Sequence, residues 1–360
     1  MIFYCISEPD YETSNWYKHI VNGLLNEKRS KRFTVILADS DDEISKFPIT
    51  AEDVLFVIGS NSEWLDNIID IFEKKFENRI IVLGNCNRSK GRRYSIVASD
   101  ISRDVMLLFN YLKSNNKNKI AMYGINPDSA SDKFRKRSFI EWSSTEEDVF
   151  LNNGNLEECF KNFKEKANEY EGIICANDYS AISLIRHMKA NKMQLPFIVS
   201  CGETMLAREF SPCITNLKTN YTEFGKAGIQ VAKMLLKNNG LNSVECYLSG
   251  EIVPGKTTEF LPMILESSVF STFKTQYDES FYADVEVDEM LRIEKLLNIS
   301  DKTDIQIIKF VMSGLTYSEI ADKLYMSTNG IKYKLKSMYE ICGANSKNEF
   351  VDLIKKYIGE

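Results

Sequence analysis

The sequence lacks the histidine and cysteine patterns that mark metal sites and the long apolar runs that mark membrane segments. It has only two histidines, and its eight cysteines form no C-x-x-C pair and no other metal-ligand spacing, so a zinc site is not expected. No apolar run approaches the ~20 residues that span a bilayer. The first residues lack the basic and apolar regions of a signal peptide. These absences favour a cytoplasmic protein with reduced thiols and no contact with a membrane.

The motifs of common enzyme chemistry are also missing. The chain has no nucleophile elbow, no dinucleotide fingerprint and no histidine-based constellation. The basic loop 88–93 lacks the spacing of a phosphate-binding P-loop. The sequence therefore predicts a protein that is not an enzyme and needs no cofactor.

Length and composition indicate an ordinary globular protein of two or three domains. The chain has 360 residues, of which 44% are hydrophobic and 27% charged. Its net charge of −6 argues against a protein that is coated with nucleic acid. Residues 300–360 hold nine lysines against eight acids, so any DNA binding there depends on a local motif rather than on overall positive charge.

The clearest local pattern lies in residues 315–343, where two short helices are separated by a tight turn. Thr316 and Glu319 form a capping box before the first helix. Ser327 caps the second helix and Gly343 ends it. The apolar stripe of the second helix consists of Ile331, Leu335, Met338 and Cys342. This pattern predicts a helix-turn-helix.

The opposite face of the second helix carries side chains that can contact DNA. At about 100° per residue, asparagine, lysine and tyrosine side chains gather on the outward side, and these types contact base edges or phosphates. The predicted DNA-binding residues are Thr328, Asn329, Lys332, Tyr333 and Lys336. Lys334, on the flank of the apolar stripe, suits a phosphate or subunit contact. An ordinary solvated helix is the alternative for this segment taken alone.

Two flanking helices are expected to complete a compact unit. Asp301 and Asp304 begin one, which runs to about Ser313 with Ile305, Ile308 and Met312 facing inward. Ser346 and Glu349 begin the other as a capping box; its expected inner residues are Phe350, Val351, Ile354 and Ile358.

With these helices, residues 299–360 resemble the LuxR-type C-terminal DNA-binding domain. The matching positions are Asp304, residues 314–321, Leu324, Ser327, Ile331, Lys332, Gly343 and Glu349. The resemblance implies an all-α domain of four helices that binds double-stranded DNA. Gly330 departs from it, since the family usually has threonine there; glycine lowers helix propensity and removes a hydroxyl that could contact phosphate.

Residues 1–262 alternate between strand-like and helix-like segments. Such alternation predicts α/β architecture with parallel sheets covered by helices on both faces. Strands are expected at 2–6, 33–37, 54–58, 80–83, 120–123, 149–151, 173–175, 197–200 and near 246–253.

Several short patterns in this region, taken in order, resemble the LacI/GalR-type periplasmic-binding-protein fold. They include Val97-x-x-Asp100, Arg135 to Phe139, and the strand at 173–176 that runs into Asn177 and Asp178. The resemblance implies two lobes, the first about 1–116 and 217–240 and the second about 118–213 and 246–262. It also implies a sugar or similar metabolite bound between the lobes, and a homodimer.

Ligands of open α/β sheets bind beyond the carboxyl ends of the strands. Polar and aromatic residues at those ends are the predicted ligand contacts: Tyr11, Trp16, Asn61, Asn177, Asp178 and Glu203. The resemblance adds Arg135, whose guanidinium can bind hydroxyl or carboxylate groups. Residues 200–203 read Ser-Cys-Gly-Glu where the family commonly has Gly-aromatic-Asp-Asp, so Glu203 supplies the sugar-orienting carboxylate or none is present. The alternatives are helix packing for Trp16, helix capping for Asp178 and a solvated face for Arg135.

Residues 263–298 form a connector with a short helix, for which a plain spacer is favoured over a lever or a dimer contact. The predicted function is a ligand-responsive, DNA-binding transcription regulator. One alternative is a phosphorylated response regulator, suggested by Asp39, Asp41 and Asp42, although 1–262 is about twice the length of a receiver. Another is a regulator that binds DNA without a ligand while its front domain binds a protein.

Overall fold

The computed structural model describes residues 1–9, 14–26, 33–38, 40–59, 61–86, 92–202, 204–238, 240–259 and 284–358. The chain divides into two compact units. The first comprises Met1–Met106, Asp128–Ser138 and Lys218–Glu251, and the second Leu107–Pro127, Phe139–Leu217 and Ile252–Glu360. Within the described residues, no helix combines the length and the apolar character needed to cross a bilayer.

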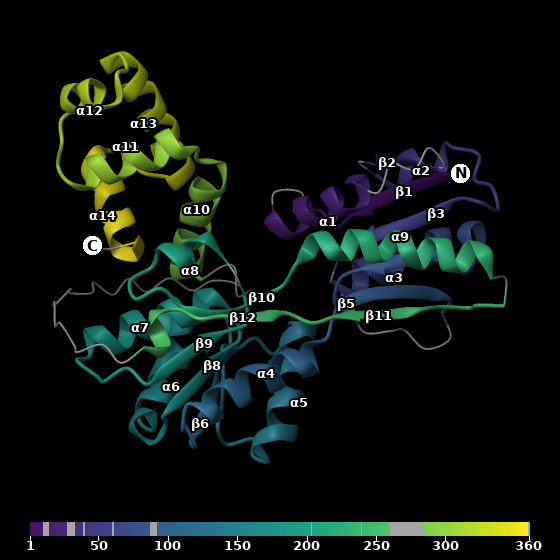
Figure 1. Ribbon diagram of the computed structural model, residues 1–360, viewed down its shortest axis with the longest axis horizontal. Helices are drawn as coiled ribbons and strands as arrows, with labels where there is room; N and C mark the ends of the chain where they lie inside the picture. The colour runs from purple at the N-terminus through teal and green to yellow at the C-terminus, as the bar shows by residue number, and fades with distance from the viewer. Residues whose placement is uncertain are drawn as a thin grey trace. The chain divides into compact units, whose positions relative to one another are not determined.

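A parallel sheet of six strands forms the centre of the first unit (Figure 1). Its order is β11-β5-β4-β3-β1-β2. Because side chains alternate across a strand, Phe3 and Cys5 face α1 and α9, whereas Tyr4 and Ile6 face α3. Its strands are β1 (Ile2–Ser7), β2 (Thr34–Ala38), β3 (Val54–Ile58), β4 (Ile80–Leu83), β5 (Tyr94–Ser99) and β11 (Glu245–Leu248).

The second unit contains another sheet of six strands, in the order β12-β10-β9-β8-β6-β7. Tyr123 and Cys175 lie on the face that packs against α6 and α7. Its strands are β6 (Ile120–Ile125), β7 (Val149–Leu151), β8 (Gly172–Cys175), β9 (Phe197–Ser200), β10 (Thr215–Lys218) and β12 (Glu251–Val253).

The two sheets repeat one topology, and the predicted fold class is confirmed. If the strands of each lobe are numbered in chain order, the first five lie side by side in the order 2-1-3-4-5 in both sheets. The prediction missed β5 and β10, and it expected one strand near 246–253. That segment instead forms β11, which pairs with β5 in the first sheet, and β12, which joins β10 in the second.

Helices connect the strands, and most of them begin where the sequence supplies a cap. Asn61, Asn155, Asn177 and Thr204 each accept a backbone N–H in the first turn of a helix. The helices of the two lobes are α1 (Asn15–Asn26), α2 (Asp41–Ser45), α3 (Ser62–Phe76), α4 (Ile101–Ser114), α5 (Ala130–Ser143), α6 (Leu156–Lys164), α7 (Asp178–Ala190), α8 (Met205–Glu209) and α9 (Tyr221–Lys237).

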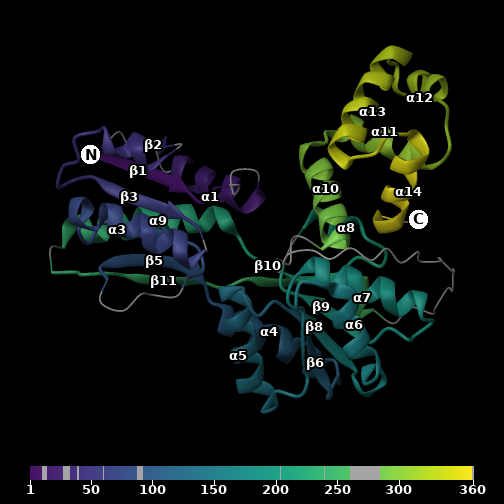
Figure 2. The same cartoon turned by 180° about the vertical axis from the view of Figure 1, so that it is seen from behind.

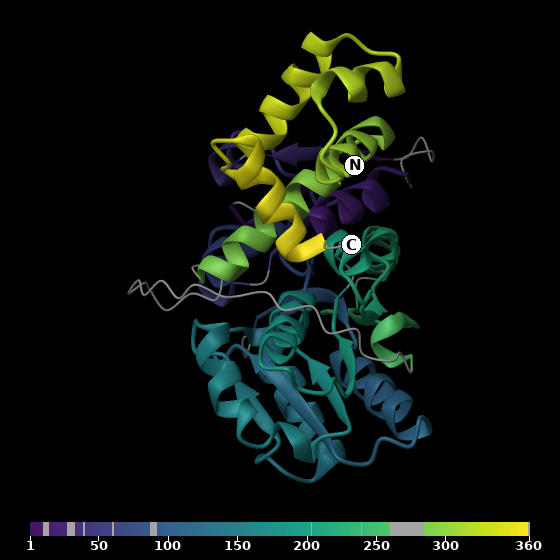
Figure 3. The same ribbon diagram turned by 90° about the vertical axis from the view of Figure 1, so that its left-hand side faces the viewer.

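Among residues 284–358 of the second unit the structure has five helices, coloured light green to yellow in Figures 1 and 3. Capping boxes begin α11 at Asp301 and α12 at Thr316, Ser327 caps α13, and Gly343 ends α13 at a φ of 68°. The expected starts and stops are therefore present. These helices are α10 (Val285–Ile299), α11 (Lys302–Met312), α12 (Tyr317–Leu324), α13 (Thr328–Cys342) and α14 (Lys347–Ile358).

The inner faces of these helices differ in part from the prediction. On α11 the predicted Ile308 is buried, together with Ile307 and Val311, while the predicted Ile305 and Met312 are only half-buried. On α14 the predicted Phe350 and Ile354 are fully buried, whereas Val351 and Ile358 are half-buried. Tyr357 is also buried, although the sequence pattern did not single it out. The capping box predicted before α14 forms only in part: Glu349 N–H donates to Ser346 Oγ (3.2 Å), but the Glu349 carboxylate accepts from the Asn345 N–H (2.8 Å).

The helix predicted within the connector is not a plain spacer. Val287, Met290 and Ile293 of α10 are fully buried in a core that continues from the second lobe into α11–α14. Helix α10 contacts α7 and α8 of the lobe as well as α13 and α14 (Figure 2). The earlier part of the connector lies within residues 260–283, outside the described residues.

Candidate functional site

The carboxyl edge of the first sheet brings Glu8 and Asn61 together. They follow β1 and β3, between which the strand order reverses, and open sheets bind ligands at such a point. The Asn61 N–H donates to a Glu8 carboxylate oxygen (3.0 Å), and Asn61 Oδ1 accepts from the Trp64 N–H (3.0 Å). Asn61 thus caps α3 while remaining exposed, and its contact with a ligand stays a prediction.

Trp16 lies in the first turn of α1 and packs toward α9. It is half-buried, and its ring centroid lies 6.3 Å from that of Tyr221. These contacts fit the helix-packing alternative, while a ligand contact by Trp16 stays a prediction. Tyr11 lies outside the described residues.

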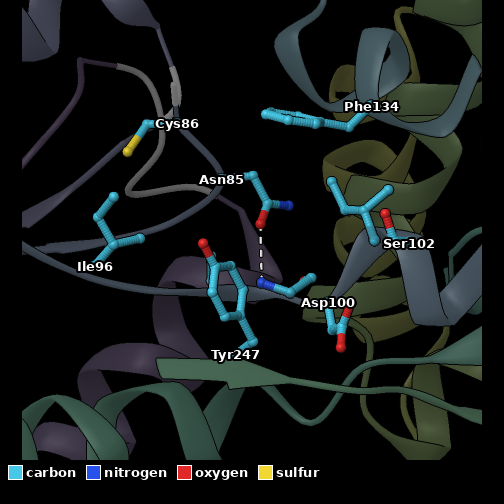
Figure 4. A pocket seen from close by; sticks show the side chains of 10 residues that line it. Asn85, Cys86, Ile96, Asp100, Ser102, Phe134 and Tyr247 are labelled. Carbon is cyan, nitrogen blue, oxygen red and sulfur yellow. Dashed lines mark hydrogen bonds between the residues drawn. The ribbon is translucent and has the colours of Figure 1, made fainter. Parts of the chain in front are cut away.

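A pocket of about 250 Å³ opens at the carboxyl ends of β4 and β5 in the first unit (Figure 4). Asn85 follows β4, Asp100 follows β5, and Tyr247 reaches the pocket from β11. Phe134 of α5 supplies a second aromatic ring. Sequence reasoning missed most of this pocket because it applied the strand-end rule to β1 and β3 but not to β4, and did not predict β5.

The pocket combines an apolar wall with a few fixed polar groups. Asn85 Oδ1 accepts from the Ser99 N–H (2.9 Å), which holds its amide in place (Figure 4). Burial, followed by the charges of Asp66 and Glu245, raises the pKa of Cys86 to about 12. Its thiol therefore stays protonated at neutral pH and is a poor nucleophile. The arrangement suits binding of a small polar molecule with an apolar face.

Arg135 lies on α5 among buried carboxylates of the first unit. Its Nη1 atom is 2.5 Å from Oδ1 of the buried Asp132. Near it, the buried Asp104 accepts from the Gly250 N–H (2.9 Å), and burial raises the pKa of Asp104 to about 6 although the Arg135 charge acts to lower it. The alternative of a solvated face does not fit Arg135, whose side chain is one-fifth exposed. Its contact with a ligand stays a prediction.

At the carboxyl edge of the second sheet, Asn177 and Asp178 have different tasks. Asn177 is the residue that caps α7, through the Ser180 N–H (2.9 Å), so the capping role considered for Asp178 is wrong. Asp178 is buried, and its carboxylate accepts from Ser200 Oγ and from the Thr204 N–H (2.6 Å). Burial raises the pKa of Asp178. Asp178 holds the loop that follows β9; ligand contacts by Asn177 and Asp178 stay predictions, and Glu203 lies outside the described residues.

Two further polar residues near this edge were missed by sequence reasoning. Asn152 follows β7. Ser180 packs closely against Gly124 of β6, where an added Cβ would lie 2.4 Å from the Ser180 hydroxyl. Both side chains are fully buried, and neither makes a hydrogen bond among the described residues. Buried polar groups without partners are rare, so these atoms are additional candidates for contact with a bound molecule or water.

The predicted DNA-binding face of α13 is exposed. Ile331, Leu335, Met338 and Cys342 are buried as expected. On the other side Asn329, Lys332, Tyr333 and Lys336 are exposed, Tyr333 to 78%, and Thr328 is half-buried in the first turn. Tyr325, in the turn between α12 and α13, is 98% exposed.

Lys334 and Gly330 behave differently from their neighbours on α13. Lys334 Nζ donates to the Asp304 carboxylate (2.7 Å), so this lysine ties α13 to α11. The contact of Lys334 with phosphate or a second subunit stays a prediction. At Gly330, an added Cβ would lie 3.2 Å from Ser327 Oγ, so a larger residue fits there with a small adjustment of the cap.

Two of the acids that suggested a receiver domain lie at the start of a helix. Asp41 and Asp42 occupy the first turn of α2, after the cap residue Ser40. Asp39 lies outside the described residues. A carboxylate in the first turn of a helix is favoured by the helix dipole alone.

Comparison with known proteins places this geometry among binding-protein folds. Residues 109–258 match the family described as periplasmic binding protein-like domain. No curated protein matches the chain. The transcriptional regulator CelR in complex with cellobiose is 14% identical, with a TM-score of 0.55 over 71% of this chain and 84% of that one. The lac repressor dimer bound to operator and an anti-inducer is 14% identical, with a TM-score of 0.53 over 71% and 93%.

A third structure has the same fold. It is a LacI-family regulator from Weissella paramesenteroides with bound sucrose, 16% identical, with a TM-score of 0.52 over 71% of this chain and 97% of that one. At these identities the likeness shows the fold alone. The chain thus has a periplasmic-binding-protein-like region whose structural neighbours are LacI-family transcription regulators.

Proposed function

We propose that this protein is a ligand-responsive transcription regulator. A small molecule bound by the two-lobed region, residues 1–262, controls the binding of double-stranded DNA by a LuxR-type helix-turn-helix in residues 299–360. One observation carries the proposal: a chain with a binding-protein fold also has a helix, α13, whose exposed face holds Asn329, Lys332 and Tyr333. The protein is expected to act in the cytoplasm, and not as an enzyme.

A sugar or a similar metabolite is the proposed effector. The neighbours include regulators bound to cellobiose and to sucrose. In this chain the pocket at Asn85, Asp100 and Tyr247 offers carbonyl and carboxylate acceptors for hydroxyl groups, and an aromatic ring for the apolar face of a sugar. The predicted contacts Tyr11, Trp16, Asn61, Arg135, Asn177, Asp178 and Glu203 remain part of this proposal.

The proposed DNA contacts come from the exposed face of α13. Asn329 can bind an adenine edge, and Lys332 a guanine edge or a phosphate. Thr328 lies at the start of the helix, where backbone N–H groups favour a phosphate, and Tyr333 and Lys336 extend the same face. The lac repressor neighbour is a dimer on its operator; a homodimer of this chain would set the spacing of two DNA half-sites in the same way.

Two experiments test the proposal on the full chain. Thermal-shift measurements against sugars, nucleosides and amino acids should find at least one compound that raises the melting temperature. Selection from a pool of random DNA duplexes should enrich one motif. Enrichment should be lost in Lys332→Ala but kept in Lys355→Ala, which removes the same charge from an exposed site on α14. Equal enrichment in both variants would exclude α13 as the DNA-binding helix.

A further inference from the structure

Helix α8 is held at its start by two carboxylates from different parts of the chain. Asp178, at the carboxyl edge of the second sheet, accepts from the Thr204 N–H (2.6 Å). Glu294 of α10 accepts from the next two N–H groups, those of Met205 (3.2 Å) and Leu206 (2.8 Å). Three consecutive backbone donors are thus shared between the edge of the sheet and α10.

The other end of α10 is anchored on the same lobe. The Asp284 carboxylate accepts from the Leu156 N–H at the start of α6 (2.8 Å). Glu286 binds Arg186 and accepts from Ser183 Oγ (2.7 Å), both on α7. All of these polar groups are buried or half-buried, so separating α10 from the lobe would leave several of them without partners at a high cost in free energy.

The opposite side of α10 is part of the C-terminal helical core. Met290 and Ile293 are fully buried there together with Leu335 of α13. Tyr357 of α14 donates to the Glu289 carboxylate (2.6 Å), and its ring lies 4.5 Å from the Arg186 guanidinium. Close-packed helices transmit a displacement instead of absorbing it, so a shift of α10 must also move α13.

We propose that α8 and Glu294 form the link by which Thr204, held by Asp178 at the carboxyl edge, controls the position of α10 and, through it, of α13. Glu294 is a positioning residue, because it is argued to act through α8 and α10 and not on a ligand or on DNA. A ligand that displaced the loop at the carboxyl edge would move Thr204, and the adjoining N–H groups of Met205 and Leu206 would carry Glu294 with them. The regulatory meaning of this link rests on the proposed function, but the link itself can be tested without DNA or effector.

The test is hydrogen–deuterium exchange of the full chain, read in α8, α10 and α13. Asp178→Asn weakens the hold on Thr204 and should speed exchange about fivefold in α8 and in α10. In a Glu294→Gln background the same substitution should still speed exchange in α8, but it should change the exchange rate in α10 less than about twofold. Asp288→Asn is the matched control: it removes the same charge from α10, but its ion pair is with Arg292 of the same helix, so it should leave the transmission intact.

The link would be overturned if Asp178→Asn left exchange in α10 unchanged in the wild-type background, or if the response of α10 persisted in full with Glu294→Gln. If Asp178→Asn fails to fold, Ser200→Ala removes one donor to the same carboxylate and takes its place; an α8 that responds to neither variant also refutes the proposal. If the thermal-shift screen found no effector or the selection enriched no DNA motif, the proposed function would be refuted, but the exchange result would be unaffected.

Discussion

Helices α10 and α13 have the same length of fifteen residues, and both place an apolar stripe in the C-terminal core. They differ in the fate of their charged residues. On α10, Glu286 and Glu294 are occupied by partners in the second lobe. On α13, Lys332 and Lys336 remain exposed. Among the described residues, the only ion-pair partner of Lys336 is Glu340 of the same helix, at 4.0 Å. A charged helix can therefore serve as a binding surface where other elements of the fold leave its charges unused.

Breaking the ion pair of α10 should have the largest effect. Arg186→Ala leaves the buried Glu286 without its guanidinium partner, which should lower the free energy of unfolding by about 3–5 kcal/mol. Chemical denaturation of the full chain measures this change. Arg186→Ala combined with Glu286→Leu should recover a large part of the loss; a single variant as stable as the wild type would show that α10 is not anchored by this pair.

The surroundings of Glu286 also predict a dependence of stability on pH. Burial acts to raise the pKa of Glu286, but the hydrogen bond with His187 and the charge of Arg186 outweigh it and lower this pKa to about 2. The stabilisation is therefore complete above the ordinary pKa of 4.5 and is lost as pH falls toward 2. Over that range the wild type should lose about 2–3 kcal/mol more than Glu286→Gln. Parallel pH profiles of the two proteins would contradict the assignment.

On α13 the effect should appear in DNA affinity and not in stability. Lys332→Ala should weaken binding of the selected duplex by about 1–3 kcal/mol if it contacts a base, with an unchanged melting temperature. Fluorescence anisotropy with labelled duplex measures the affinity. Lys334→Ala sharpens the comparison, since Lys334 is paired with Asp304: it should reduce stability slightly and DNA affinity less than Lys332→Ala does. The reverse ranking would contradict the division between used and unused charges.

The smallest effect is expected at Gly330. Replacement by alanine should raise helix propensity by up to about 1 kcal/mol, reduced by the adjustment needed at Ser327, whose hydroxyl lies 3.2 Å from the added Cβ. Thermal unfolding of Gly330→Ala measures the net gain. A clear loss of stability would mean that the cap at Ser327 cannot adjust.

The same contrast explains what could be predicted from sequence. The caps at Thr316, Ser327 and Gly343 were predicted because each depends on residues a few positions away. The role of α10 was not, because the partner of Glu286 lies 100 residues earlier in the chain. The pocket adds a second long-range contact to the failure to predict β5, since Asn85 and Tyr247 meet only after β11 has joined β5.

Local patterns also left the details of packing open. On α11 the periodicity predicted an inner face of Ile305, Ile308 and Met312. Packing against the neighbouring helices buries Ile308 as predicted, but places Ile307 and Val311 beside it. Trp16 and Asp178 were proposed for a ligand from their place after strands, yet their described contacts are with Tyr221 and with the loop after β9. Position along the chain indicates the edge of the sheet, and packing decides which side chains remain available there.

The central claim is that a small molecule controls DNA binding by this chain. It is tested most directly by the affinity of the full chain for its selected duplex, measured with and without each compound that raises the melting temperature. We expect at least one such compound to change this affinity by about fivefold or more. An affinity that is the same with and without every one of them would contradict the claim.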